Sequence, residues 1–306
     1  MANQEAKFIE RIEIKGLWNR YDVDWQLNPD VNILVGENGT GKSTILAILY
    51  IVVGYNLNYK KEILCKEFIL YLTNRNPLHY TDFASSYSEI PDYGYIPREI
   101  EEHKSEIEGI NVNYINTFDN QLIVSDLDRK YNQNLLTELD FQLEKILNLY
   151  INYQLNQSKK IINQKQNAEK VFAKQKYLFE TLNRLFSETE KIVDENENKI
   201  VFLFENGEKI DATKLSSGEK QLLIILLTVL CQDEKPSILI MDEPEISLHF
   251  SWQYELIKII RKLNPNCQLI IATHSASIFA KGWMDKLFFI EEKGGKGIRH
   301  KMLQPV

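Results

Sequence analysis

Cysteine is scarce in this sequence, and long apolar runs are missing. The 306 residues include three cysteines, Cys65, Cys231 and Cys267, which lie far apart. They show no paired spacing, which argues against a disulfide framework and against a zinc site built from cysteine pairs, so we interpret the three as buried thiols. No run approaches the roughly 18 apolar residues of a membrane span, and the N-terminus has no apolar signal segment. We therefore expect a cytoplasmic protein without a membrane partner.

Positive charge is also in deficit, because the net charge is -7. An acidic balance disfavours nucleic-acid binding by the whole surface but leaves a local basic patch open. With 44% hydrophobic and 26% charged residues, the composition is ordinary for a folded chain with a sizeable core. The length exceeds the usual ~100 to 200 residues of a domain, so one large domain with an insertion and two close domains are both compatible with it.

The middle of the chain lacks the residues that interrupt helices. No proline occurs between Pro97 and Pro236, and no glycine between Leu127 and Val193, so long helices are permitted. We expect two helices of about 30 residues, or roughly 45 Å, each. A polar segment, 156–167, would form the tip of this hairpin. The two predicted apolar stripes are Leu127, Tyr131, Leu135, Leu139, Leu143, Ile146, Tyr150 and Tyr153, and then Ile161, Val171, Leu178, Leu182, Leu185 and Ile192.

Strands are expected on both sides of this stretch. Alternating or continuous apolar patterns predict strands in four segments: 8–18, 21–27, 31–35 and 112–118. The dipeptide Asn206-Gly207 between two short apolar runs predicts a hairpin. After it, apolar helices and strands alternate, which indicates a parallel sheet. The segment 54–97 has no clear period and is interpreted as irregular with some helix.

A glycine-rich loop follows the strand predicted in 31–35. Its sequence, GENGTGKS, fits G-x-x-x-x-G-K-[ST] and precedes a helix-like stretch, as that motif requires. Glycines let backbone N–H groups wrap phosphates, and the helix N-terminus adds its positive end. Lys42 would contact the β- and γ-phosphates, Ser43 would ligate Mg²⁺ and Thr44 would donate to the α-phosphate, whereas a glycine-rich turn without a ligand is the alternative. The predicted nucleotide-binding residues are Gly36, Glu37, Asn38, Gly39, Thr40, Gly41, Lys42, Ser43 and Thr44.

Two adjacent carboxylates end the apolar run ILIMDE. Neighbouring side chains on a strand point in opposite directions, so the two acids can take different roles. Asp242 would hold Mg²⁺, and Glu243 would polarise the attacking water as general base. The alternative is a pair of solvated turn residues before Pro244.

Two further motifs place polar groups at the ends of buried elements. The segment LSSGEKQ precedes a strongly apolar helix, and Ser216 with Glu219 fits a capping box, whose helix N-terminus is also an anion site. His274 follows the apolar run QLIIA. A lone histidine there is more often a satisfied polar residue, but its place one strand–helix unit after the paired acids favours a role at the same site.

In chain order, GENGTGKST, LSSGEKQ, ILIMDEPE and THS are similar to the Walker A, signature, Walker B and switch-histidine motifs of ABC ATPases. The resemblance implies an α/β head with a P-loop NTPase core, N-terminal antiparallel strands, a helical lobe and a short helical-hairpin insertion. It also implies a homodimer that holds two ATP molecules. Ser216, Ser217 and Gly218 of one copy would then face the γ-phosphate bound at Lys42 of the other, and His274 would sense that phosphate.

Several positions indicate which group of ABC ATPases the chain resembles most. Ser217 and Glu219 stand where transporter ATPases usually carry glycine and glutamine, and His249 stands where their D-loops have aspartate. The chain thus resembles the AAA_15/AAA_21 and OLD-like group, relatives of the Rad50 and SMC heads, many of which serve in anti-phage systems such as Septu, PARIS and retrons. The resemblance also implies a metal-contacting glutamine after a middle strand, for which Gln121 is the candidate. An adenine-stacking aromatic would be Trp18 or Tyr21, unless both are sheet core.

The motifs and the helical stretch predict a division into four segments. In order, they are a first head lobe with Walker A, an irregular and helical region with the Q-loop strand, a helical arm, and the rest of the head. Their expected bounds are 1–54, 55–125, 126–195 and 196–306.

Two functions remain open at this point. The first is an ATP-dependent regulatory subunit of an anti-phage system. Its effector, a nuclease or toxin, would be a separate protein, because only a short tail follows the last predicted strand. The second is a DNA-repair or DNA-binding ATPase of the Rad50/SMC type, with a basic arm as the nucleic-acid contact. Under either function, a homo-oligomer larger than the head dimer is open. Six lysines near the predicted tip, opposed only by Glu169, motivate this contact, although a solvated helix face explains them as well. They are Lys159, Lys160, Lys165, Lys170, Lys174 and Lys176.

Overall fold

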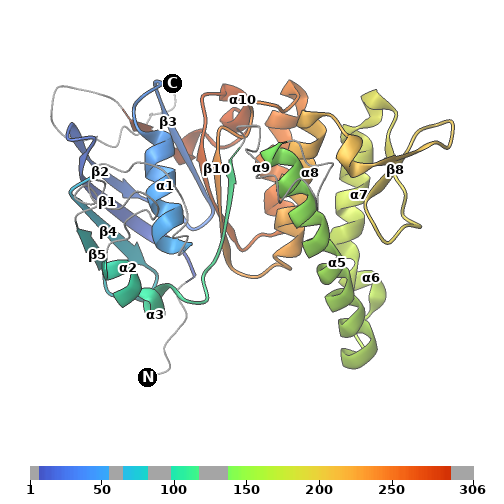
Figure 1. The fold of residues 1–306 in the computed structure, drawn as a ribbon, viewed down its shortest axis with the longest axis horizontal. Helices are drawn as coiled ribbons and strands as arrows, with labels where there is room; N and C mark the ends of the chain where they lie inside the picture. Colours follow the sequence, from blue (N-terminus) through green and yellow to red (C-terminus); the bar gives the residue numbers. More distant parts are fainter. Residues whose placement is uncertain (1–6, 55–64, 82–97, 117–136, 291–306) are drawn as a thin grey trace, which may run out of the picture. The chain divides into compact units, whose positions relative to one another are not determined.

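The computed structural model describes residues 7–54, 65–81, 98–116 and 137–290, whose helices and strands are drawn in Figure 1. Gln121 lies outside these ranges, and so do three positions of the first predicted helical stripe: Leu127, Tyr131 and Leu135. None of the described helices is both long and apolar enough to cross a membrane.

The chain forms two compact units, and each is assembled from separate segments. Unit 1 comprises Met1–Asn116, Pro236–Pro244 and Asn266–Val306, and unit 2 comprises Thr117–Lys235 and Glu245–Pro265. The predicted division into four consecutive segments stays a prediction.

A five-stranded parallel sheet is the centre of unit 1. In spatial order its strands are β12 (Leu287–Ile290), β3 (Val31–Gly36), β11 (Cys267–Ala272), β10 (Ser237–Asp242) and β6 (Asn111–Asn116). Every residue of β10 and β11 is buried, because this sheet is covered on both faces, and this explains why the two strands read as continuous apolar runs. The predicted parallel sheet is confirmed.

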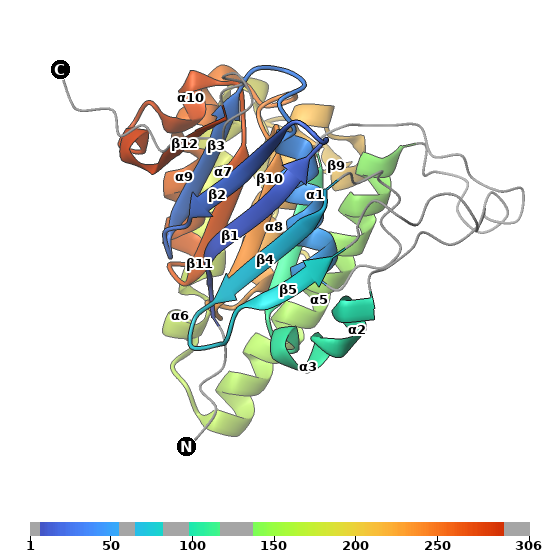
Figure 2. The same cartoon turned by 90° about the vertical axis from the view of Figure 1, so that its left-hand side faces the viewer.

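A four-stranded antiparallel sheet is the second layer of unit 1 (Figure 2). Helix α1 (Lys42–Val53) packs on the parallel sheet and shares one apolar core with both sheets, so it is buried nearly all round. The rings of Trp25 and Phe288 stack at 5.1 Å between β2 and β12. The antiparallel strands are, in spatial order, β2 (Tyr21–Gln26), β1 (Ile9–Leu17), β4 (Glu67–Leu72) and β5 (Leu78–Thr81). The remaining short helices of unit 1 are α2 (Arg98–Glu102), α3 (Lys104–Ile107), α10 (Ala276–Phe279) and the 3₁₀ turn η3 (Met284–Lys286).

The interpretation of 54–97 as irregular with some helix is wrong where the structure describes it. Strands β4 and β5 lie in this segment and complete the antiparallel sheet. Strand β4 is buried at four of six positions, so its pattern has no strict alternation. Pairing with β1 rather than local periodicity fixes it as a strand.

Helix α8 (Ser217–Cys231) is the centre of unit 2. Its apolar residues are buried on nearly every side, as predicted, because α5 (Glu138–Gln164), α7 (Ala173–Leu185) and α9 (Phe250–Leu263) all pack on it. The described part of the first predicted stripe is buried on α5, at Leu139, Leu143, Ile146, Tyr150 and Tyr153. The first helix of the expected arm is therefore packed along much of its length.

The second helix of the expected arm is shorter than predicted. Helix α5 continues to Gln164, so Ile161 belongs to it, and Lys165 then takes the left-handed conformation that ends the helix. After α6 (Ala168–Val171), helix α7 has only 13 residues, and Ile192 lies in a strand. The expectation of two equal helices of about 30 residues is wrong for the second one.

A small antiparallel sheet completes unit 2. The predicted hairpin at Asn206-Gly207 is confirmed, and Gly207 has φ +79°, which its lack of a side chain permits. Phe186 packs on Phe202 and on Trp252, with ring centroids 5.5 Å apart in both pairs. The elements here are η1 (Ser187–Thr189), β7 (Ile192–Val193), β8 (Val201–Leu203), β9 (Lys209–Asp211) and η2 (Ala212–Lys214).

Candidate nucleotide site

The glycine-rich loop joins the end of β3 to the start of α1. Gly39 and Gly41 have φ of +80° and +89°, a conformation that glycine adopts without strain. A Cβ on Gly41 would lie 3.0 Å from the Tyr21 hydroxyl, and one on Gly36 would lie 2.8 Å from the carbonyl oxygen of Ile290. The Tyr21 hydroxyl also donates a hydrogen bond to the carbonyl of Thr40. The loop thus needs glycine at these points, and β2 supports it from outside.

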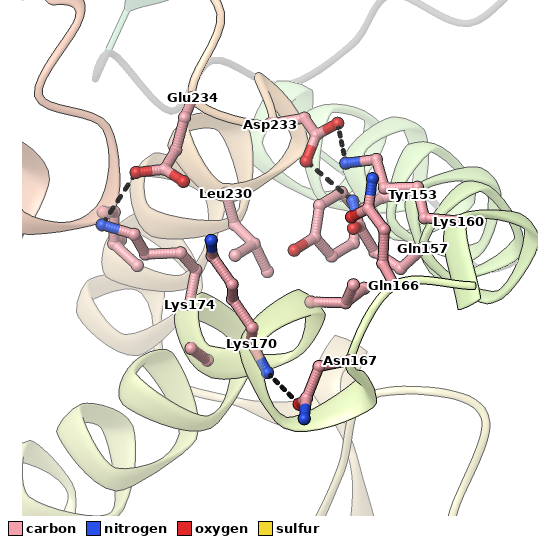
Figure 3. A pocket seen from close by; sticks show the side chains of 13 residues that line it. Tyr153, Gln157, Lys160, Gln166, Asn167, Lys170, Lys174, Leu230, Asp233 and Glu234 are labelled. Carbon is pink, nitrogen blue, oxygen red and sulfur yellow. Dashed lines mark hydrogen bonds and ion pairs between the residues drawn. The ribbon is translucent and has the colours of Figure 1, made fainter. Parts of the chain in front are cut away.

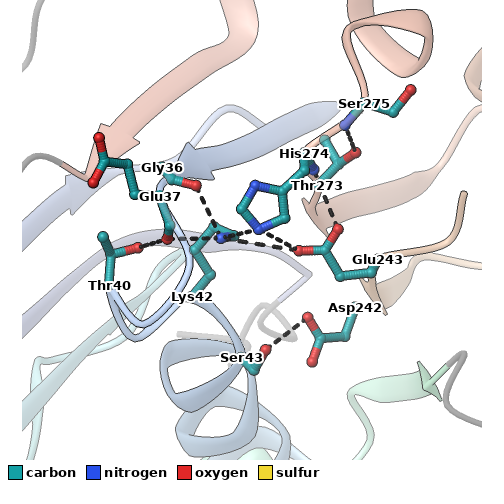
Figure 4. Close-up of polar contacts among 10 residues, drawn as sticks. All are labelled: Gly36, Glu37, Thr40, Lys42, Ser43, Asp242, Glu243, Thr273, His274 and Ser275. Carbon is teal, nitrogen blue, oxygen red and sulfur yellow. Dashed lines mark hydrogen bonds and ion pairs between the residues drawn. The ribbon is translucent and has the colours of Figure 1, made fainter. Parts of the chain in front are cut away.

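Lys42 is buried at the first turn of α1, with 5% of its surface exposed. Its Nζ donates to the carbonyl oxygens of Gly36 at 3.0 Å and Glu37 at 3.2 Å, so the ammonium lies inside the curve of the loop (Figure 4). A buried ammonium at a helix N-terminus is suited to an anionic ligand that brings its own negative charge.

Ser43 and Asp242 face each other across the same site. The Ser43 hydroxyl donates to Asp242 Oδ1 at 3.0 Å, although the two residues come from α1 and from the end of β10 (Figure 4). Asp242 is 1% exposed. A hydroxyl and a carboxylate are the hard oxygen donors that Mg²⁺ prefers, and Mg²⁺ takes its other ligands from water and phosphate. The donor set therefore fits this ion.

Glu243 is held in an unusual backbone conformation. Its φ is +50°, rare for a residue with a side chain, and Pro244 disfavours the right-handed helical alternative. Its N–H donates to the carbonyl of Ala272 at 2.8 Å, and its Oε2 accepts from the backbone N–H of His274 at 3.2 Å. Backbone strain of this kind concentrates at functional sites, where the surroundings must maintain it.

The imidazole of His274 lies between Lys42 and Glu243. Its Nε2 is 2.6 Å from Lys42 Nζ and 3.1 Å from Glu243 Oε1 (Figure 4). A neutral ring nitrogen either accepts or donates a hydrogen bond, so Nε2 serves one of these two neighbours at a time. The structure thus brings Lys42, Ser43, Asp242, Glu243 and His274 together, from three separate loops at the carboxyl ends of β3, β10 and β11.

The signature residues lie in unit 2, at the start of α8. Ser216 accepts from the N–H of Glu219 at 3.4 Å, and Glu219 Oε2 accepts from the N–H of Ser216 at 3.0 Å, which confirms the predicted capping box. The side chains of Ser216 and Ser217 are exposed. Glu219 is 1% exposed, and its Oε1 accepts from Lys191 at 2.8 Å and from Thr189 at 2.9 Å. The signature glutamate therefore anchors its own loop instead of facing solvent.

Glu219 also makes the stability of unit 2 depend on pH. Burial raises the pKa of Glu219, but the Lys191 ammonium and the hydrogen bonds from Ser216 and Thr189 outweigh it and lower the pKa overall. We expect Glu219→Gln to reduce the free energy of unfolding at pH 7 by about 3 kcal/mol, because Lys191 loses its buried partner. A carboxylate whose folded-state pKa lies below its unfolded-state pKa contributes its full stabilisation above the unfolded-state pKa and loses it as pH falls through the folded-state pKa, so the deficit should shrink over that range.

Urea unfolding at several pH values measures this difference. Glu188→Gln is the matched control, because Glu188 is exposed in η1, next to the Thr189 that bonds Glu219, and its replacement should cost little at any pH. A deficit that stayed constant down to acid pH would show that packing rather than charge explains it.

The segment after the paired acids packs on the signature within unit 2. A Cβ on Gly218 would lie 2.2 Å from the carbonyl oxygen of Ser247, so only glycine fits there. Gln253 donates to the carbonyl of Leu248 at 3.0 Å and holds the same segment. His249 is exposed, and its Nδ1 lies 2.7 Å from the Ser251 hydroxyl.

Two aromatic residues, Trp18 and Tyr21, both border the phosphate loop. Each is partly buried against the core of unit 1, and Trp18 Nε1 would lie 3.3 Å from a Cβ on Gly41. The structure thus places both next to the loop and against the core at once. That one of them stacks on adenine, and is not simply part of the sheet core, stays a prediction.

The lysine patch is less basic than the sequence indicates. Lys160 pairs with Asp233 at 2.6 Å and Lys174 pairs with Glu234 at 3.0 Å, so Glu169 is not the only opposing acid (Figure 3). Both acids come from the turn after α8, far away in sequence. The other four lysines are exposed. A patch reduced in this way gives less support to a nucleic-acid contact.

A family model described as "AAA domain, putative AbiEii toxin, Type IV TA system", AAA_21, matches residues 31–280. The protein named Retron Vc95 probable ATPase, of Vibrio cholerae serotype O1 biovar El Tor, is 26% identical over 164 residues, 50% of this chain and 31% of that protein. The Phosphate import ATP-binding protein PstB of Malacoplasma penetrans (strain HF-2) is 34% identical over 82 residues, 27% of each protein. The alignments thus span about a third or less of each relative.

Among solved structures, the chain is similar to two SMC heads. One is the SmcHead bound to the C-winged helix domain of ScpA, with a TM-score of 0.48 and 15% identity over 92% of this chain and 93% of that one. The other is the SMC head domain from Thermotoga maritima, with a TM-score of 0.44 and 14% identity over 89% and 91%.

Proposed function

The chain belongs to the AAA_21 family and is an ATPase, and from this we propose that two copies close face to face around two Mg-ATP molecules and regulate a separate effector. The observation that carries the chemical part is the convergence of Lys42, Glu243 and His274 in unit 1. A cation, a carboxylate and an imidazole within hydrogen-bond reach suit phosphoryl transfer to water, in which charge must be stabilised and a proton moved.

Each residue has a role that follows from its position. Lys42 would exchange the carbonyls of its own loop for the β- and γ-phosphates, and Thr44 would donate to the α-phosphate. Ser43 and Asp242 would hold Mg²⁺, which supplies further positive charge to the phosphates. Glu243 would take the proton of the attacking water. Once Lys42 moves to the phosphates, Nε2 of His274 is released to donate to the γ-phosphate or to Glu243.

The exposed signature supports composite sites. Ser217 presents its hydroxyl at the N-terminus of α8, where helix N–H groups and the helix dipole favour an anion. Ser216 is exposed beside it, and its hydroxyl donates to Glu219 Oε2 at 2.9 Å in the capping box. The chain's own contacts leave both side chains accessible. A γ-phosphate bound at Lys42 of a second copy matches this anion site in charge and hydrogen bonding.

The role in defence rests on the relatives. Half of the chain matches a protein named as a probable retron ATPase, and the description of its family names a putative toxin of a toxin–antitoxin system. Both similarities support a component that works together with a partner protein. We propose a cytoplasmic regulatory subunit whose ATP state controls the effector.

A phage challenge tests this role in cells that carry the chain with its flanking genes. We expect protection that the chain alone does not provide and that Lys42→Ala abolishes, because that variant loses its phosphate contact. Protection by the chain alone would contradict a separate effector. Full protection by Lys42→Ala would contradict control by ATP. In that case, capture of the effector by the tagged chain, compared with and without Mg-ATP, would decide whether the chain binds an effector at all.

A further inference from the structure

A cavity of about 570 Å³ lies within unit 2, where the end of α5, the short helix α6 and the start of α7 meet the ends of α8 and α9 (Figure 3). None of its lining residues belongs to the nucleotide site described above. Its volume falls within the roughly 300 to 1,000 Å³ of small-molecule sites.

One hydroxyl in the cavity wall has no partner among the described residues. Tyr153 is 6% exposed, yet its hydroxyl makes no hydrogen bond with any residue in the described ranges, and it points into the cavity (Figure 3). Gln157, 1% exposed, donates its amide N–H to Asp233 at 2.8 Å, while its amide oxygen has no partner in the same part of the chain. The cavity leaves both polar atoms accessible, and tyrosine hydroxyls and amides in largely buried side chains normally have a hydrogen-bond partner, so the two atoms suit a polar group of a ligand.

The charged lining leaves one cation in excess. Of three lysines and two acids, Lys160 pairs with Asp233 and Lys174 pairs with Glu234, so three positive minus two negative charges leave one. The remaining lysine, Lys170, has no ion pair among the described residues and extends toward the cavity (Figure 3). The pairs fix both acids, and the free ammonium is available to an anion.

Two consecutive lining residues are also strained. Asp233 and Glu234 have φ of +54° and +56°, which L-residues rarely adopt. The bonds from Gln157 and Lys160 to both oxygens of Asp233 hold this turn in place. Strained residues cluster at ligand sites, where the surroundings maintain them.

We propose that this cavity binds a small phosphate monoester of the size of a nucleoside monophosphate. The ammonium of Lys170 receives the phosphate, as lysines do at other phosphate sites. The Tyr153 hydroxyl and the Gln157 amide oxygen meet the hydrogen-bonding edge of the base or the sugar. Leu230 of the signature helix α8 lines the same cavity, so the ligand contacts the opposite end of the helix that begins at the signature.

Isothermal titration calorimetry of the full chain tests the site, in a Lys42→Ala background that removes binding at the phosphate loop. The probes are AMP, GMP, CMP, UMP, ribose 5-phosphate and inorganic phosphate. We expect saturable binding of at least one nucleoside monophosphate. Tyr153→Phe and Lys170→Ala should each weaken it about tenfold, the equivalent of one hydrogen bond to a charged or buried group.

Two variants are matched controls. Tyr150→Phe is the control for Tyr153→Phe, because it removes the same hydroxyl one turn away on α5, from a residue that does not line the cavity. Lys159→Ala is the control for Lys170→Ala, because Lys159 is an exposed lysine of α5 that does not line the cavity. Both should leave binding unchanged, and thermal melting confirms that all four variants fold. Ribose 5-phosphate binding as tightly as AMP would support the class and place recognition in the sugar phosphate.

Three results would overturn the proposal. They are no saturable binding of any ester, equal losses in the controls and the test variants, and inorganic phosphate binding as tightly as the esters. Because the measurement is direct and uses a chain without its phosphate-loop lysine, it stands apart from the outcome of the ATPase and defence experiments.

Discussion

Glu243→Gln is expected to bind ATP with unchanged affinity while its hydrolysis rate falls by about 10² to 10⁴-fold. The amide has the shape of the carboxylate and keeps an oxygen that can accept from the N–H of His274, now found at 3.2 Å. It cannot take a proton from water. Every phosphate contact therefore survives, and only the chemical step is lost.

Three measurements check this outcome. Phosphate release gives the rate, equilibrium dialysis with radiolabelled ATP gives the affinity, and size-exclusion chromatography with Mg-ATP should show accumulated dimer, since bound ATP is no longer consumed. Glu10→Gln is the control, because Glu10 is an exposed glutamate of unit 1 outside the site. Hydrolysis at the original rate in Glu243→Gln would mean that another group is the base.

The parts of this site that are contiguous in sequence could be predicted from it. The loop from Gly36 to Ser43, the acids Asp242 and Glu243, and the capping box at Ser216 each carry their geometry within a few residues. For the loop and the acids, the apolar pattern also predicts the local context, a buried strand that precedes the loop. The place of His274, one strand–helix unit after the paired acids, then favoured a role at the same site.

Contacts between distant segments could not be predicted in the same way. The sequence gives no sign that Lys191 would pair with Glu219, or that Asp233 would neutralise Lys160. Strand β4 was missed because pairing with β1 rather than its own pattern defines it. The length of the second arm helix was overestimated because α5 continues to Gln164 before the chain turns. The turn depends on the left-handed backbone of Lys165, and apolar periodicity does not locate such a turn.

Two inactive variants are expected to restore activity when they are mixed. Lys42→Ala loses the phosphate contact, and Ser217→Glu places a negative charge where the γ-phosphate of the other copy would lie. Ser217 is exposed at the first position of α8, where an acidic residue favours the helix, so folding is preserved. In a mixed dimer, the intact loop of the Ser217→Glu copy meets the intact signature of the Lys42→Ala copy, which forms one complete site.

The size of the recovery follows from random pairing. In an equal mixture half of the dimers are mixed, and each has one working site of two, so about a quarter of the original rate is expected if the sites act independently and the dimer is symmetric. Phosphate release before and after mixing measures it. A mixture no more active than the two variants apart would contradict composite sites.

The double variant Lys42→Ala/Ser217→Glu separates composite sites from sites within one chain. Mixed with an equal amount of the unaltered chain, it leaves no complete site in the mixed dimers, because each site combines one altered and one intact element. Activity should then fall to about a quarter if two-fold pairing makes every site composite. If each chain carried its own whole site, half would remain. The same two substitutions thus restore activity when they lie on different chains and suppress it when they share one, a pattern that only a site shared between copies produces.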